Sequence, residues 1–184
     1  QDAGYPQANC NKKCCVDAWE DPNNKKFVSC IALVDPISNE QWIFDATPDI
    51  KFQLYTLEKI SGLNPLNGIF LTHAHIGHYT GLMQLGREVM GTKNLPVYSM
   101  ERMEFFLKNN APWNQLVDIQ NIDIVRLKSD SMIQLNKRIM IIYRFIRLQC
   151  FFLILLLISK NGFNWLKASI KEICCQKRKH KNGK

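Results

Sequence analysis

The chain has 184 residues, of which 46% are hydrophobic, and this is enough to build the buried core of one domain. Its net charge of +8 is unevenly distributed. Residues 1–136 contain 12 Lys and Arg against 15 Asp and Glu, whereas residues 137–184 contain 12 Lys and Arg against Glu172 alone. The basic charge therefore belongs to the tail. Because no aromatic residues are interleaved with its charges, we expect no nucleic-acid partner.

The patterns of residues 27–127 alternate between strands and helices. Strands are predicted at residues 27–34, 41–44, 67–72, 96–100 and 122–127, and helices at residues 50–61, 79–90 and 101–110. Thr47 or Asp49 is expected to cap the first of these helices, which ends at Gly62. Residues 1–26 are polar and rich in turn formers. Strands that alternate with helices indicate an α/β layered domain.

Three of the four His residues lie within six positions, directly after the predicted strand at 67–72. His73 and His75 are two residues apart in an extended segment, so their side chains project to the same side. His78 follows at the start of the next predicted helix. Neutral imidazole is a good ligand for zinc and for iron. The spacing therefore predicts a metal site at His73, His75 and His78, and the alternative is a chance cluster on a surface turn.

The segment from Phe70 to His78 resembles the metal-binding motif of the metallo-β-lactamase superfamily, a strand followed by His-x-His-x-Asp-His. The resemblance implies an αββα sandwich, of which this chain holds the N-terminal half, and a metal-dependent hydrolase. His73 and His75 match the pair that binds one metal in that family, and His78 matches the last His. Gly77 stands where the family has an Asp that binds a second metal. We therefore expect one metal, with zinc preferred and iron as the alternative.

Two more stretches are similar to pyrroloquinoline quinone biosynthesis protein B, a family of the same superfamily. Residues 4–10 (G-Y-P-Q-A-N-C) are similar to its G-F-P-Q-x-N-C stretch, and residues 46–50 (A-T-P-D-I) are similar to its A-S-P-D-I stretch. The matches occur in the same order as in that family. The resemblance implies that the first strand of the family precedes Gln1. No signal peptide is visible, and the sequence leaves the location unknown: the bacterial cytoplasm, or the periplasm if an upstream signal peptide is missing.

Two sets of residues outside the His cluster are also candidates. In the superfamily, an Asp at the end of the strand before the His motif supports the metal site by contacting the metal ligands instead of the metal. Asp45 matches this Asp. The alternative is that Asp45 is a helix-cap or turn residue. Cys10, Cys14 and Cys15 match a Cys-rich stretch of the quinone-biosynthesis family and are candidates for a structural zinc site, with Cys30 as a fourth ligand. Free or disulfide-bonded thiols are the alternative.

The composition changes at residue 137, and we place the end of the partial metallo-β-lactamase-like domain at residue 136. Residues 139–158 are apolar but contain Arg144 and Arg147, each of which costs about 2.5–3.5 kcal/mol near the bilayer centre. Membrane association through this segment is therefore not expected. A buried helix is the second interpretation. The favoured one is that residues 137–184 are not native family sequence, for example because of a shifted reading frame.

Further ligands of the superfamily usually come from later in the chain. After His78 the next His is His180 in the basic tail, and Asp118, Asp123 and Asp130 lie in no matching motif. The prediction is a metal-dependent hydrolase-type protein that acts on a small-molecule substrate, which the sequence does not identify. The alternative is a catalytically inactive fragment or metal-binding module that lacks the downstream ligands.

Overall fold

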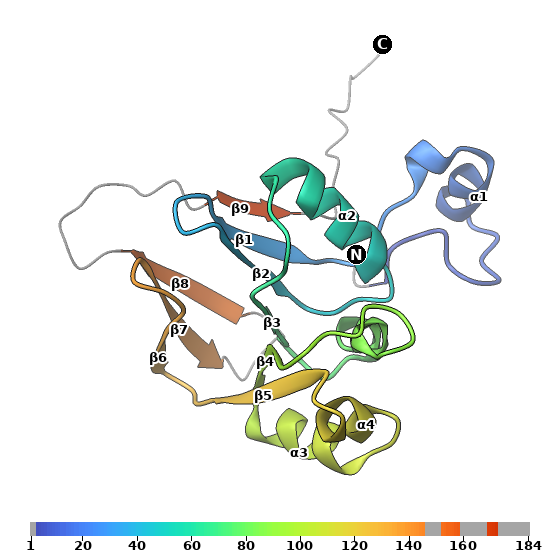
Figure 1. The fold of residues 1–184 in the computed structure, drawn as a ribbon. Coiled ribbons are helices and arrows are strands. Elements are labelled where there is room, and N and C mark those ends of the chain that lie inside the picture. The colour runs from blue at the N-terminus through green and yellow to red at the C-terminus, as the bar shows by residue number, and fades with distance from the viewer. Residues whose placement is uncertain (1–2, 146–151, 159–168, 173–184) are drawn as a thin grey trace.

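The structure is a computed structural model that describes residues 3–145, 152–158 and 169–172 (Figure 1). Its helices are α1 (Lys13–Glu20), α2 (Ile50–Ser61), α3 (Glu101–Asn109) and α4 (Trp113–Asp118), with 3₁₀ turns η1 (Pro22–Asn24), η2 (Ile76–His78) and η3 (Thr80–Leu85). Its strands are β1 (Ile31–Asp35), β2 (Glu40–Phe44), β3 (Gly68–Phe70), β4 (Leu95–Met100), β5 (Ile122–Leu127), β6 (Ser131–Gln134), β7 (Ile139–Phe145), β8 (Phe152–Ile158) and β9 (Ser169–Glu172).

The strands form two sheets. The larger sheet has the order β5-β4-β3-β2-β1-β9, and the smaller has the order β6-β7-β8. Strands β2 to β5 pair in parallel, because a helix or a helical turn connects each to the next, whereas β1 pairs antiparallel with β2 through a short hairpin. This mixture of parallel strands and crossover helices confirms the predicted α/β class.

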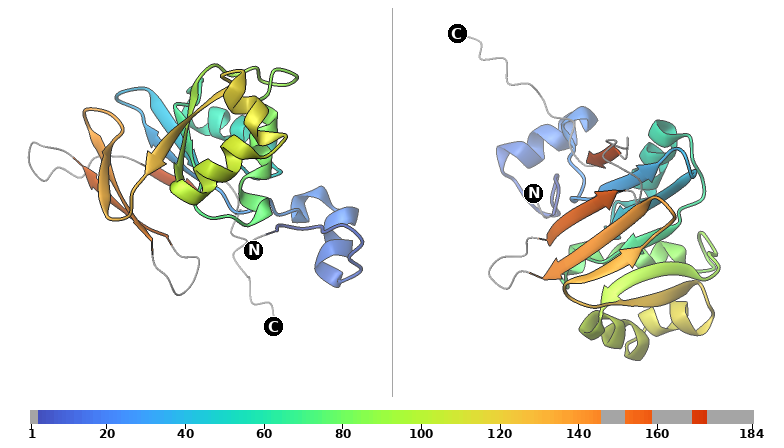
Figure 2. Two further views of the ribbon diagram at one scale, coloured as in Figure 1. Left: turned by 90° about the horizontal axis from the view of Figure 1, so that it is seen from below. Right: turned by 90° about the vertical axis from the view of Figure 1, so that its left-hand side faces the viewer.

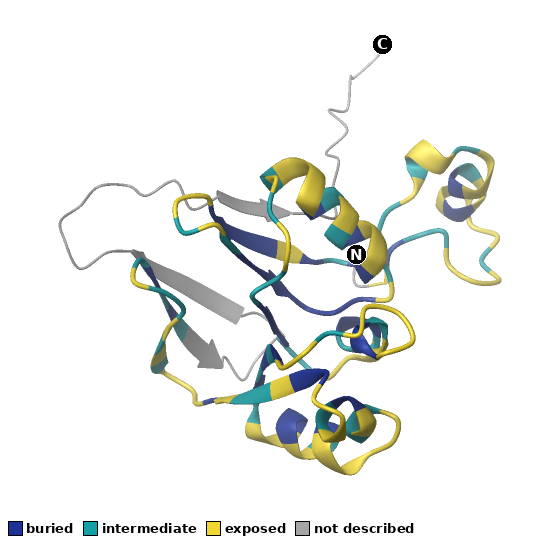
Figure 3. Cartoon of the chain, in the orientation of Figure 1, coloured by how far each residue is buried: buried dark blue, intermediate teal, exposed yellow. Residues whose placement is uncertain are grey.

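The larger sheet is covered on both faces, as the views of Figures 1 and 2 show. One core packs α2, α3 and η3 against one face and includes Ile43, Leu57 and Val97. A second core packs β7 against the other face and includes Trp42 and Ile139. Neighbouring residues of β2 enter different cores because side chains alternate along a strand. The domain is therefore layered, with β1, β2 and β3 mostly buried and its helices exposed on their outer sides (Figure 3).

Helix α2 has the bounds that the sequence predicts. Gly62 ends it in the left-handed conformation, with φ of 71°, and donates its N–H to the carbonyl of Glu58 at 2.8 Å. Neither Thr47 nor Asp49 caps α2 with a side-chain hydrogen bond to a backbone N–H of its first turn. Asp49 is at the N-cap position, but its carboxylate accepts the N–H of Val28 at 3.0 Å. Thr47 instead accepts the N–H of Asp49 at 3.1 Å through its hydroxyl.

The helix predicted at residues 79–90 is wrong. The segment forms the 3₁₀ turn η3 and then turns that run to Gly91. The cause is Gly81, which donates its N–H to the carbonyl of Ala46 at 2.9 Å. A Cβ atom on Gly81 would lie 2.1 Å from the carbonyl oxygen of Thr47, so this backbone is pressed against the segment after β2. The contact fixes the path of residues 79–85, and it replaces regular helix.

Six of the described helices and strands were not predicted as such: α1, α4, β6, β7, β8 and β9. Helices α1 and α4 are short, and β6 is an edge strand of the smaller sheet. Strands β7 and β8 lie within the apolar segment 139–158, where they pair antiparallel, so the buried-helix interpretation is not met in its described residues. Among the helices that the structure describes, none is long and apolar enough to cross a membrane.

Candidate metal centre

The candidate site lies where two neighbouring parallel strands end. β2 and β3 are paired with Phe44 opposite Phe70, so the residues that follow them leave the same edge of the sheet. The N–H of Asp45 continues this pairing and donates to the carbonyl of Phe70 at 2.7 Å. Thr72 and His73 follow β3 directly. Parallel pairing therefore places the segments that carry Asp45 and the His residues beside each other, although they are far apart in sequence.

Asp45 is the polar centre of this edge. It is buried, and its backbone has φ of 73°, a conformation that Asp tolerates better than most residues. Its Oδ1 atom accepts the backbone N–H of Thr72 at 2.8 Å, and the Thr72 hydroxyl lies 2.7 Å from each carboxylate oxygen. Its Oδ2 atom lies 2.8 Å from Nδ1 of the buried His78. The carboxylate is thus held by the residues on both sides of the turn that carries the His cluster.

These contacts define which ring nitrogens carry protons. A carboxylate can only accept, so Nδ1–H of His78 donates to Asp45, and its Nε2 atom, on the far side of the ring, is the nitrogen suited to a metal. The Thr72 hydroxyl donates its one proton to Asp45. It therefore accepts from Nδ1 of His73, which lies 2.9 Å away. Nε2 of His73 is consequently the unprotonated nitrogen of that ring.

His75 joins the cluster through His73. Nδ1 of His75 lies 2.9 Å from Nε2 of His73, and the ring centres are 4.5 Å apart. The rings of His73 and His78 are also close, at 4.1 Å, but those of His75 and His78 are separated by 6.5 Å. Two nitrogen ligands of a tetrahedral zinc, each about 2.0–2.1 Å from the ion, lie roughly 3.3 Å apart. The facing nitrogens of His73 and His75 therefore need to part only slightly to share one ion.

The described residues contain one group of three metal-binding side chains whose ligand atoms lie within 4.8 Å of one another: Asp45, His73 and His78. His75 is exposed and lies outside that group, next to His73. The donor set fits a divalent cation, because three neutral imidazoles and one carboxylate supply nitrogen and oxygen ligands with a single negative charge. The assignment of His73, His75 and His78 as metal ligands stays a prediction, as does the supporting role of Asp45.

The turn that carries His78 is anchored to the segment after β2. The backbone N–H of Ala46 donates to the carbonyl of His78 at 2.9 Å, and the N–H of Gly81 donates to the carbonyl of Ala46 at 2.9 Å. Gly81 fits because it has no Cβ atom, as described above. This pair of hydrogen bonds fixes the distance between Asp45 and His78 through the backbone as well as through their side chains.

Thr72 is the site residue that sequence reasoning missed. It stands directly before His73, and its hydroxyl bridges the Asp45 carboxylate and Nδ1 of His73. A Thr at the end of a short strand is ordinary because β-branched residues favour strands. The one available signal was its position immediately before the first His of the motif.

The cysteine candidates are not gathered into a ligand set in the part of the chain that the structure describes. Cys14 is exposed and Cys15 is buried at adjacent positions of α1, and Cys10 lies in the preceding turn. Sγ of Cys15 accepts the backbone N–H of Gln7 at 3.4 Å. Cys10, Cys14 and Cys15 are free thiols. The structural zinc site at Cys10, Cys14 and Cys15 stays a prediction.

Comparison with known proteins agrees with this geometry. Residues 41–143 match the family model described as the beta-lactamase superfamily domain. The matched range includes nearly all of β2, the whole of β3 and the whole His cluster. The chain therefore belongs to the beta-lactamase superfamily. The matched range ends seven residues beyond the boundary predicted at residue 136, within β7.

Three individual proteins show how the chain relates to that superfamily. A ribonuclease Z of Staphylococcus carnosus is 37% identical over 79 residues, which are 41% of this chain and 25% of that protein. The zinc-bound structure of PqqB from Methylobacterium extorquens superposes with a TM-score of 0.62 at 15% identity, covering 78% of this chain and 52% of that one. A diphosphatase of the PhnP family superposes with a TM-score of 0.54 at 23% identity, covering 76% and 51%. The chain thus spans about half the length of the solved structures and a quarter of the ribonuclease, and the sandwich fold is confirmed.

Proposed function

We propose that this chain supplies the first ligand group of a zinc-dependent hydrolase, with the metal bound by His73, His75 and His78. The observation that carries the proposal is the set of close polar contacts around Asp45. Its carboxylate holds His78 directly and His73 through Thr72, so both rings turn an Nε2 atom away from the carboxylate. A His held by a carboxylate through its other nitrogen is typical of metal ligands.

The chemistry of such a site follows from the metal. A bound zinc ion lowers the pKa of a coordinated water and supplies a hydroxide nucleophile near neutral pH. The role of the protein itself is to orient the rings and to exclude competing hydrogen bonds. Asp45 and Thr72 do this through contacts of 2.7–2.9 Å with each other and with the rings of His73 and His78. A role resembling that of PqqB is the finer form of the proposal, supported by the stretches at residues 4–10 and 46–50 and by the fold. The substrate is proposed to be a small molecule.

One observation favours a second candidate function, a metal-binding module without turnover. Gly77 has no side chain at the position where the superfamily motif carries a metal-binding Asp. The described residues offer no second group of three ligands to complete the site. A site with few ligands binds metal more weakly and holds a nucleophilic water poorly.

The test is metal content. Purified protein is analysed for zinc and iron beside the double variant His73→Ala/His75→Ala and the control variant His180→Ala, which replaces the one His that is outside residues 73–78 of the sequence. We expect about one equivalent of metal in the parent and control proteins and its loss in the double variant. Metal retained by the double variant would contradict the site and point to Cys10, Cys14 and Cys15. Bound metal without hydrolysis of ester, lactam or phosphodiester substrates would select the second function.

A further inference from the structure

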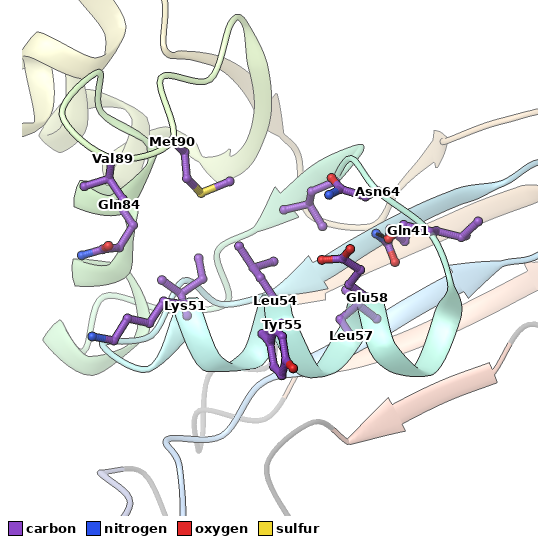
Figure 4. A pocket seen from close by; sticks show the side chains of 13 residues that line it. Gln41, Lys51, Leu54, Tyr55, Leu57, Glu58, Asn64, Gln84, Val89 and Met90 are labelled. Carbon is purple, nitrogen blue, oxygen red and sulfur yellow. Dashed lines mark hydrogen bonds between the residues drawn. The ribbon is translucent and has the colours of Figure 1, made fainter.

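A pocket separate from the metal centre opens between α2 and the segment that follows η3 (Figure 4). Its volume is about 310 Å³, at the lower end of the range of about 300–1,000 Å³ typical of small-molecule sites. None of its lining residues belongs to the His cluster or to Asp45. Its size therefore suits a small ligand, and its position is independent of the proposed hydrolase.

Four leucines give the pocket an apolar part. Leu54 and Leu57 of α2 and Leu63 and Leu66 of the loop that follows it are among the lining residues. Leu57 is fully buried, whereas the other three are partly exposed within the pocket. Contact with a ligand would remove this apolar surface from water, which favours a ligand with an apolar body.

The two ends of the pocket carry opposite charges. Lys51 and Glu58 are seven residues apart on α2, which places them on the same side of the helix and about 10 Å apart along its axis. The side-chain amide of Gln84 lies at the Lys51 end, and that of Asn64 at the Glu58 end (Figure 4). The pocket thus presents a cation, an apolar middle and an anion in a row, with an amide group beside each charge.

We propose that this pocket binds a short apolar peptide of about three residues with both termini free. An extended chain covers roughly 3.3–3.6 Å per residue, so three residues span the separation of the two charges. The peptide carboxylate meets Lys51 and the terminal ammonium meets Glu58. The amides of Gln84 and Asn64 are suited to bond its peptide groups, and the leucines receive its side chains.

The opposite charges favour a peptide over a simple amphiphile. A fatty acid satisfies Lys51 but leaves the Glu58 carboxylate beside an alkyl chain, and an alkylamine leaves Lys51 in the same position. Both side chains are exposed, and an ion pair at an exposed site contributes about 0.2–1 kcal/mol, so the loss of one pairing lowers the affinity by up to about fivefold. Ligands with one charge should therefore bind measurably more weakly than a zwitterion of matching length.

The test is calorimetric titration of the full chain with the tripeptide leucyl-alanyl-leucine. Its N-acetylated form, its C-amidated form and octanoate are titrated alongside. We expect each of the three to bind about two- to fivefold more weakly than the free tripeptide. Equal binding of the free and blocked peptides, or tighter binding of octanoate, would overturn the proposal.

Charge variants locate the site. Lys51→Glu and Glu58→Lys should each weaken binding of the tripeptide by about fivefold, and the double exchange should restore most of it, because the peptide can then bind in the reverse direction. Lys93→Glu, an exposed cation outside the pocket, is the matched control and should change nothing. Circular dichroism of each variant verifies folding. A double exchange that binds no better than the single variants, although folded, would overturn the proposed orientation and with it the site.

Discussion

Asp45 and His78 are 33 residues apart in sequence, yet the carboxylate of one accepts a hydrogen bond from Nδ1 of the other at 2.8 Å. Both side chains are buried. The contact exists because β2 and β3 run in parallel and because η2 folds back on the segment after β2. It joins the end of a strand to the turn that carries the His cluster, and the predictions that follow start from it.

Replacing Asp45 by Asn should weaken zinc binding by roughly 10–100-fold, the usual effect of losing a group that orients a metal ligand. Asn has the same shape and tolerates the positive φ of this position, so the fold should persist. Its amide offers only one acceptor oxygen, however, to Thr72 and His78. Competition with a chromophoric chelator measures the affinity. Asp123→Asn, an exposed residue of β5, is the control. Equal affinities for both variants would contradict the role of Asp45.

Thr72→Val should also weaken zinc binding, because Nδ1 of His73 loses its acceptor and the Asp45 carboxylate loses a donor. A buried polar group left without its partner costs about 1–3 kcal/mol, so the free energy of unfolding should fall by a similar amount. Thr72→Ser keeps the hydroxyl and should restore the metal affinity. Urea unfolding and chelator competition of the pair give both readouts. A Ser variant as weak as the Val variant would contradict the role assigned to the hydroxyl.

The sequence predicted those parts of the fold that depend on local patterns. Helix α2 has its predicted bounds because an apolar face and Gly62 define it locally, and β5 has its predicted bounds at residues 122–127. The His cluster was found because its three residues are adjacent in the chain. Its relation to Asp45 was supplied by resemblance, since no local pattern joins residues 33 positions apart.

What could not be predicted depends on contacts between distant segments. Residues 79–90 have apolar positions at helical spacing, but Gly81 is pressed against Thr47, and a regular helix does not form there. The role of Thr72 depends on the pairing of β2 with β3 in the same way. The pocket beside α2 joins residues from 41 to 90, and no motif marks it.

Gly81→Ala should destabilise the fold by about 1–3 kcal/mol, the usual cost of forcing an extra group into a packed site. The new Cβ atom would lie 2.1 Å from the carbonyl oxygen of Thr47, and backbone has to move to relieve this contact. Gly86→Ala is the matched control, because its Cβ atom would meet the end of the flexible Glu88 side chain at 3.1 Å. Urea unfolding compares the two. A Gly81 variant as stable as the Gly86 variant would mean that η3 and the segment after β2 adapt freely to the extra group.

Glu104 should make the stability of the domain depend on pH. The carboxylate is buried and is held by the guanidinium of Arg126 and, at 2.7 Å, by the ammonium of Lys108. The hydrogen bond from Arg126, followed by that from Lys108, lowers the pKa of Glu104 below its usual value of 4.5, against the opposing effect of burial. A lowered pKa in the folded state means that the carboxylate stabilises the fold fully above pH 4.5, and that this contribution is lost as the pH falls through the folded-state pKa.

Glu104→Gln should therefore lower the free energy of unfolding at pH 7 by about 1 kcal/mol, a value reduced by the half-exposed position of Arg126. The difference from the parent protein should shrink as the pH falls below 4.5, because both proteins then carry a neutral side chain at this position. Urea unfolding across pH 3–7 measures it. Glu101→Gln removes the exposed partner of the same Arg126 and should change stability by less than about 0.5 kcal/mol at any pH. A difference for Glu104→Gln that persists unchanged at pH 3 would show that packing, and not the ionised carboxylate, links α3 to β5.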